Sequence, residues 1–256
     1  MHRSLLISTF SVLGSLLILF LLAPLLLFFT GISLSDLMKY GLREDALNAL
    51  CITIAASSLS TILLLLLGIP ISYVIARRTF RGRDLIRSLV DLPLIIPHGV
   101  AGIAILIAYN SRAPLGSLLA RTGIIIEDSF WGIVTVMCFV SAPLMVDTLI
   151  DGFLSVDQSL EHVARSLGAS EWRTFLTVTL PLSFRSVITA SIMAWARGIS
   201  EVGALLIVAY YPKSINVLIM DRFWNYGLEA AKATALPLLA ISVSCFILLK
   251  WLSGRR

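Results

Sequence analysis

The sequence predicts an all-α protein that crosses a membrane six times. Of its 256 residues, 58% are hydrophobic and 14% are charged, and the mean hydropathy is +0.94. Soluble domains contain about 45–50% apolar and about 25% charged residues, so this chain has little room for a soluble domain. Charge-free apolar runs recur along it, and each is long enough for a helix to cross a bilayer, which takes about 20 residues.

The first two apolar runs precede a basic turn. Residues 4–35 carry no charge. This run is longer than the core of a signal peptide, about 7–15 residues, and we interpret it as a retained membrane span. After a polar stretch at 36–45, residues 46–76 form the second uncharged run. Five arginines follow it closely: Arg77, Arg78, Arg81, Arg83 and Arg87.

The third span, about residues 85–110, contains an interruption. Residues 91–102 read DLPLIIPHGVAG, with Pro97, His98 and Gly99 at the centre. Proline removes a backbone donor and glycine weakens a helix, so this backbone needs cover from protein or access to water. These three residues are candidates for a translocation pathway. His98 is either a hydrogen-bonded histidine between helices or a proton carrier.

The second half of the chain completes the predicted topology. Residues 111–128 form a polar loop, and further spans are predicted at about 130–149, 186–211 and 233–251. If both termini are cytoplasmic, most of the 20 lysines and arginines lie on the inner side, Arg255 and Arg256 included. Positive residues concentrate in cytoplasmic loops, so the charge pattern supports this orientation in a plasma membrane. The net charge of +5 therefore reflects topology and does not indicate nucleic-acid binding.

The longest polar interruption, residues 157–181, predicts two short helices joined at a glycine. We call this segment the elbow, and the charge pattern places it in the cytoplasm. Asp157 and Ser170 are suited to cap the two helices, and Gly168 falls where helices commonly end in a left-handed residue. An apolar stripe follows one face of the first helix: Leu160, Val163, Ala164 and Leu167. Such a stripe lies either on the lipid surface or against another protein.

Arg197 and Glu201 are charges within the predicted fifth span. They are four residues apart, which places them on one face of a helix. A charge at the centre of a membrane costs about 2.5–3.5 kcal/mol, so it is usually paired or faces water. One interpretation is an ion pair that only neutralises both groups. The other is that this face lines a translocation pathway, where an arginine suits an anionic solute.

The elbow resembles the EAA loop of binding-protein-dependent ABC importer permeases. In that family a Glu-Ala-Ala run is followed by a glycine and then Leu-Pro. Here His162 replaces the glutamate, with Glu161 one residue earlier, and Val163 replaces the first alanine. The resemblance implies that the elbow docks into a groove on an ATP-binding subunit. The implied coupling residues are His162, Val163, Ala164, Gly168 and Pro181.

Residues 91–102 and 195–212 are similar to the molybdate/tungstate permeases, especially the archaeal tungstate type. Sulfate permeases share a looser version. The resemblance implies the type I ABC importer permease fold as a single transmembrane domain over residues 1–256, with a core at about 45–252. It also implies a homodimer, two copies of a separate ATP-binding subunit, and an extracytoplasmic oxyanion-binding protein. The preferred oxyanion remains open.

No motif indicates catalysis by this chain alone. The GxxxxGK[ST], HExxH and GxSxG patterns are absent, and the three cysteines lie singly in apolar runs, so we expect no catalytic residue, metal site or cofactor. One alternative of a different class is a secondary transporter driven by protons through His98, Asp91 or Glu201. A membrane scaffold or enzyme is another. Neither alternative explains why the chain would have the elbow.

Overall fold

The computed structural model describes the backbone of residues 2–254 and the side chains of residues 6–247. All regular structure in this part of the chain is helical, which confirms the predicted all-α fold. Four helices are long and apolar enough to cross a membrane unbroken, and two bent helix pairs bring the count to six if each pair is one span. The unbroken helices are α1 (His2–Phe28), α3 (Glu44–Arg77), α7 (Phe130–Leu154) and α14 (Leu228–Gly254).

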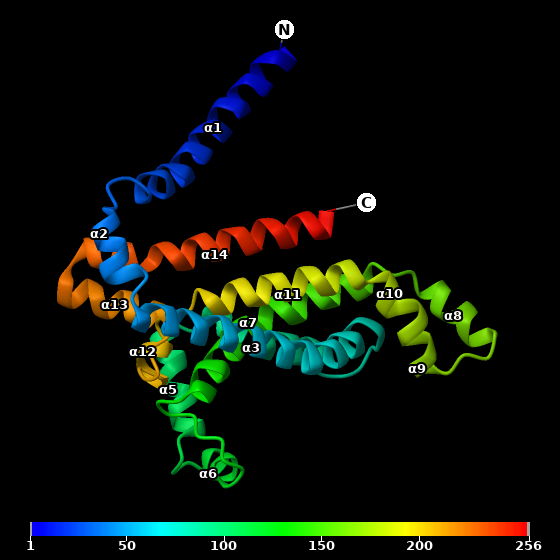
Figure 1. Cartoon of the computed structure of the whole chain (residues 1–256). Coiled ribbons are helices and arrows are strands. Elements are labelled where there is room, and N and C mark those ends of the chain that lie inside the picture. The colour runs from blue at the N-terminus through cyan, green and yellow to red at the C-terminus, as the bar shows by residue number, and fades with distance from the viewer. Residues whose placement is uncertain (1, 255–256) are drawn as a thin grey trace.

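Helices α3, α7 and α11 (Phe184–Ile199) form the centre of the structure and lie side by side (Figure 1). Helix α7 is the most buried of the candidate spans, and Leu149 and Phe153 on it have no exposed surface. Polar contacts join the helices as well: Ser72 Oγ donates a hydrogen bond to the carbonyl of Val146 at 3.1 Å. Small hydroxyl residues suit helix packing in a membrane because they allow close approach and bond across helices.

Helix α1 stands apart from this bundle (Figure 1). No residue of its span Leu6–Phe28 is fully buried by the rest of the chain, and only Ala23 and Phe28 in it are partly buried. The connection to α3 contains a short helix α2 (Leu34–Asp36) and a π-helical turn η1 (Leu37–Gly41), which packs against α14. The exposed apolar surface of α1 must be covered by lipid or by another protein, because contact between this surface and water is unfavourable.

The predicted interruption of the third span is confirmed. Helices α4 (Arg83–Ile95) and α5 (His98–Tyr109) meet at an angle of 117°. Ile96 has an extended backbone, with φ −72° and ψ 126°, as expected of a residue that precedes a proline. Pro97 then occupies the N-cap position of α5.

The fifth span ends earlier than predicted. We expected a helix over 186–211, with the third span as the broken one, but α11 ends at Ile199 and a separate turn, α12 (Leu205–Val208), follows. The freed carbonyls have a partner that the local sequence does not reveal. The Asn216 side-chain amide donates to the carbonyls of Ile199 at 2.7 Å and Glu201 at 2.9 Å. Arg197 and Glu201 therefore do not share one helix, because Glu201 lies beyond the end of α11.

Two connections contain helices that the sequence did not predict, one of them within the expected loop at 111–128. Within 111–128 lies α6 (Pro114–Arg121), which begins with a proline at a position where its missing N–H costs nothing. Between the fifth and sixth spans lies α13 (Ile215–Tyr226), capped by the Ser214 side chain and packed on α14. The sixth span begins at Leu228, before the predicted residue 233. Arg255 and Arg256, which enter the charge pattern, lie outside the described residues.

Candidate functional site

The elbow lies at one end of the bundle, and α12 and α13 lie at the other (Figure 1). Its first helix, α8 (Gln158–Ser166), begins at Asp157, whose carboxylate accepts a hydrogen bond from the backbone N–H of Ser159 at 2.8 Å. This bond to the ionised form holds the pKa of Asp157 below its ordinary value. The second helix, α9 (Glu171–Thr174), is capped by Ser170. Both predicted caps are confirmed.

Gly168 joins the two helices in the left-handed conformation predicted for it, with φ +92°. After α9 the chain continues through a π-helical turn, η2 (Phe175–Thr179), and a short helix, α10 (Leu180–Leu182). The proline of the elbow predicts a turn into the next span at residue 181. Pro181 instead lies inside α10, and the 71° bend falls two residues later, between Leu182 and Phe184.

The apolar stripe of the elbow is exposed. Leu167 is 83% exposed and Trp172 is 71% exposed, and Val163 beside them is 57% exposed. Ala164 is half-buried and His162 is exposed. Leu160 of the stripe and Leu176 on η2 are exposed as well. Because none of these large side chains is packed away by the chain, the elbow presents an apolar surface of the kind that marks interaction sites.

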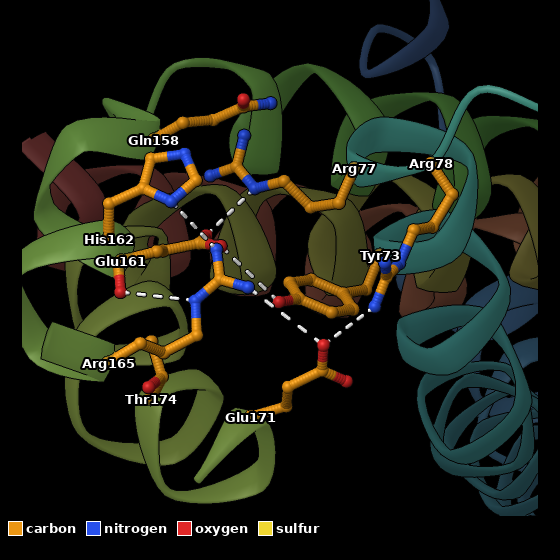
Figure 2. Close-up of a pocket in the computed structure, with 9 residues that line it drawn as sticks. All are labelled: Tyr73, Arg77, Arg78, Gln158, Glu161, His162, Arg165, Glu171 and Thr174. Carbon is orange, nitrogen blue, oxygen red and sulfur yellow. Dashed lines mark hydrogen bonds and ion pairs between the residues drawn. The ribbon is translucent and has the colours of Figure 1, made fainter. Parts of the chain in front are cut away.

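A polar cavity of about 200 Å³ lies on the inner side of the elbow, between α8 and the end of α3 (Figure 2). Its centre is Glu161, which is buried. One carboxylate oxygen accepts hydrogen bonds from Arg77 Nε and Thr179 Oγ1, both at 2.8 Å, and the other accepts one from the Tyr73 hydroxyl at 3.4 Å. Arg77 also donates from Nη2 to the carbonyl of Val156 at 2.9 Å. Sequence reasoning missed this pair.

The neighbouring residues His162 and Glu161 of the elbow differ in direction. His162, at the position of the family glutamate, is exposed, and its Nδ1 lies 3.2 Å from Nη2 of Arg165. Glu161, one residue earlier, points inward. The sequence does contain a signal for the Arg77–Glu161 pair. Arg77 follows directly on a long uncharged run, so the arginine needs an acidic partner close to the end of that span.

His98, Arg197 and Glu201 are brought together at the other end of α11, and we call them the charge cluster. Oε2 of Glu201 lies 3.0 Å from Nη2 of Arg197 and 3.0 Å from Nδ1 of His98. Nε2 of His98 lies 3.0 Å from the same Arg197 nitrogen. Arg197 can only donate, so Nε2 of His98 accepts from it. Oε2 of Glu201 lies at ion-pair distance from both nitrogens but has no hydrogen-bond partner among the residues that the structure describes. Predicted from separate stretches, the three candidates form one contact group.

Burial within the charge cluster is uneven. The Glu201 side chain is fully buried, while Arg197 is 20% and His98 49% exposed. The other carboxylate oxygen of Glu201 accepts a bond from the N–H of Ala204 at 3.0 Å. The cluster therefore presents its nitrogen groups to the open side and holds its carboxylate inside. Pro97 and Gly99 contribute no polar side chain to it, but they position the start of α5 on which His98 stands.

Comparison with known proteins identifies the family of the chain. Residues 68–256 match the family described as the binding-protein-dependent transport system inner membrane component. The chain is 44% identical, over 99% of its length and 98% of the relative, to a molybdate/tungstate transport system permease protein of Pyrococcus furiosus. A probable sulfate transport system permease protein of Chlorokybus atmophyticus is more distant, at 31% identity over 83% of this chain and 75% of the relative.

The solved structures give the fold. A bacterial ABC transporter involved in the import of the acidic polysaccharide alginate aligns with a TM-score of 0.77, over 98% of this chain and 96% of the other, at 16% identity. At that identity the likeness concerns the fold alone. The sequence matches and this fold together show that the chain is a multi-pass membrane protein that belongs to the inner membrane components of binding-protein-dependent transport systems.

Proposed function

We propose that this chain is the permease subunit of an ATP-driven ABC importer for molybdate or tungstate. The observation that carries the proposal is the exposed apolar face of the elbow, at one end of a bundle whose relatives are permeases. An apolar surface of this kind outside the membrane marks a site that binds another protein. In the proposed assembly two copies of the chain form a homodimer in the plasma membrane, with both termini in the cytoplasm. Two ATP-binding subunits and an extracytoplasmic oxyanion-binding protein complete it.

The elbow is the proposed coupling element. An amphipathic helix that lays its apolar face in a groove is a common mode of protein recognition. His162, Val163 and Ala164 lie on α8 close to that face, and Gly168 sets the angle between the two helices of the elbow. Pro181 is the last residue of the elbow and lies on α10, which leads into α11. Closure of the ATP-binding subunits would thus move the end of the bundle.

The charge cluster is the proposed anion contact of the pathway. Arg197 and His98 are the partly exposed members, and both offer N–H groups. Glu201, fully buried behind them, offsets the arginine charge and keeps the resting site close to neutral. A tetrahedral oxyanion would contact a fixed cation there but would bind only weakly, because the site is close to neutral. Weak binding permits both entry and release. Pro97 and Gly99 hold the broken segment that presents His98.

Two alternatives have specific support. A sulfate permease of the same family would use the same elbow and cluster, and a sulfate relative matches at lower identity. A proton-coupled secondary transporter is favoured by the two broken spans and by contact between His98 and Glu201, since paired broken helices are typical of such proteins. The exposed elbow argues against the second alternative, which gives it no partner.

The decisive experiment is reconstitution of the chain with its ATP-binding subunit and binding protein in vesicles. ATP hydrolysis and uptake are measured with the binding protein loaded by tungstate, molybdate or sulfate. We expect stimulation by tungstate and molybdate above that by sulfate. Uptake that needs a proton gradient and no ATP would contradict the importer assignment, and stronger stimulation by sulfate would move the chain to the sulfate class.

A further inference from the structure

We propose that Glu161, with Arg77 and Thr179, is the link through which movement of the elbow reaches the membrane spans. This inference rests on the proposed coupling function of the elbow. It assigns a positioning role to three residues that point away from the docking face, and it separates them from the exposed residues that would meet the ATP-binding subunit.

Glu161 joins segments that are far apart in the sequence (Figure 2). It stands on α8 and accepts from Arg77 at the end of α3 and from Thr179 at the end of η2. Arg77 in turn donates to the carbonyl of Val156, just beyond the end of α7. One buried ion pair therefore connects α8 with the ends of two spans and with the segment that leads into α11.

Apolar packing does not supply this connection for α8. Among the residues of α8, Glu161 is the one that is buried, whereas Leu160 and Val163 face outward. The following segment is anchored differently: the ring of Phe175 on η2 packs against Tyr73 at 4.9 Å and Phe153 at 6.1 Å between ring centroids. Apart from the covalent connection to α7 through residues 155–157, a force applied to α8 thus passes to the spans through the Glu161 carboxylate.

Burial distinguishes this ion pair from its neighbour. The side chains of Arg77 and Glu161 are 6% and 5% exposed, whereas Arg78 and Glu171, at the same 2.8 Å separation, are 62% and 66% exposed. An exposed pair is screened by water and holds its partners weakly. A buried pair with every oxygen bonded is confined to one geometry, because any other leaves a charge unpaired in a low dielectric. Of these two ion pairs, only Arg77–Glu161 is held firmly enough to transmit a displacement of the elbow to the spans.

The test measures oxyanions transported per ATP hydrolysed by the reconstituted complex, with tungstate as the probe. The variants are Glu161→Gln and Thr179→Val, and the matched control is Glu171→Gln, which breaks the exposed pair in the same elbow. We expect Glu161→Gln to keep the copurified ATP-binding subunit and its hydrolysis, while transport per ATP falls about fivefold or more, the lower end of typical coupling between sites. Thr179→Val should lower the ratio less, and the control should not change it.

A purely structural role predicts another pattern. Uptake and hydrolysis would then fall together with the amount of complex, and the ratio would stay at the wild-type value, which would overturn the proposal. If Glu161→Gln does not accumulate, Thr179→Val decides, because it removes one hydroxyl and leaves the ion pair in place; a wild-type ratio for it overturns the proposal. Failure of the wild-type chain to bind any ATP-binding subunit would instead contradict the proposed function itself.

Discussion

A Cβ atom added to Gly203 would lie 2.8 Å from the Cβ of His98, closer than two such atoms approach in proteins. The two broken segments, at the start of α5 and after α11, are therefore packed directly on each other. This contact fixes where the His98 ring stands relative to Glu201. The glycine at 203 is thus a steric requirement of the charge cluster.

Gly203→Ala should displace the start of α5 and separate His98 from Glu201. Overpacking of this kind costs about 1–3 kcal/mol of folding free energy. We expect uptake to fall while the protein still accumulates in the membrane. Gly14→Ala on α1 is the control, since no atom of the described residues lies within 4 Å of a Cβ built there and α1 stands apart from the charge cluster (Figure 1). Equal uptake by the two variants would show that the contact is unimportant to transport.

Variants of the charge cluster can distinguish whether Arg197 and Glu201 only neutralise each other or whether Arg197 also binds the anion. Arg197→Gln leaves Glu201 buried beside a partly exposed histidine, and breaking a buried ion pair costs about 3–5 kcal/mol. Its yield in the membrane and its melting temperature in detergent should therefore fall. Arg197→Gln with Glu201→Gln should restore much of both.

The same double variant then tests the pathway. If Arg197 contacts the anion, uptake of tungstate by the restored protein should remain low. Wild-type uptake by a stable double variant would remove Arg197 from the pathway and leave the pair as a neutralising one. His98→Gln, measured beside it, shows whether the ring contributes separately, because it leaves Arg197 and Glu201 paired.

Topology is tested by labelling single cysteines in intact cells. The natural cysteines at 51, 138 and 245 are first replaced by serine. A cysteine at the exposed position Arg81 should react with a membrane-impermeant maleimide only after lysis, whereas one at the exposed position Thr122 should react in intact cells. Reaction at position 81 from outside would reverse the orientation inferred from the charge pattern and place the elbow on the wrong side for an ATP-binding subunit.

Much of the fold follows from local sequence. Uncharged runs predict the unbroken spans, and Pro97 predicts the bend in the third, because a proline restricts the residue before it. Asp157, Gly168 and Ser170 predict the elbow helices for equally local reasons. These features depend on a few neighbouring residues, and the structure retains them.

The remaining features depend on distant partners. The end of α11 at Ile199 is stabilised by Asn216, which only the folded chain brings to its carbonyls. The predicted topology places Arg222 on the outer side of the membrane. In the structure it is buried, pairs with Asp45 at 2.8 Å and donates to Thr234 at 2.7 Å and to the carbonyl of Tyr40. Charge counting cannot distinguish such a residue from a solvated one.

The conformation of Gly168 gives the strictest test of the elbow. Its φ of +92° is unfavourable for residues with a side chain, and no atom lies within 4 Å of a Cβ built there. A substitution therefore strains the backbone without a clash, at about 1–2 kcal/mol and more for a β-branched residue. Gly168→Val should insert normally, because the spans are untouched, and should lose the copurified ATP-binding subunit. Gly168→Ala should be milder, and Gly168→Asn milder still.

Gly123 supplies the control for that strain. It has a similar φ of +86°, also with open space around its Cβ, but it lies on the loop between α6 and α7, away from the elbow. Gly123→Val carries the same backbone penalty and should keep the ATP-binding subunit. If both valine variants lose it, the effect is general destabilisation. If Gly168→Val retains the subunit and wild-type uptake, the angle between α8 and α9 is not what the ATP-binding subunit recognises, and the elbow loses its role as the coupling element.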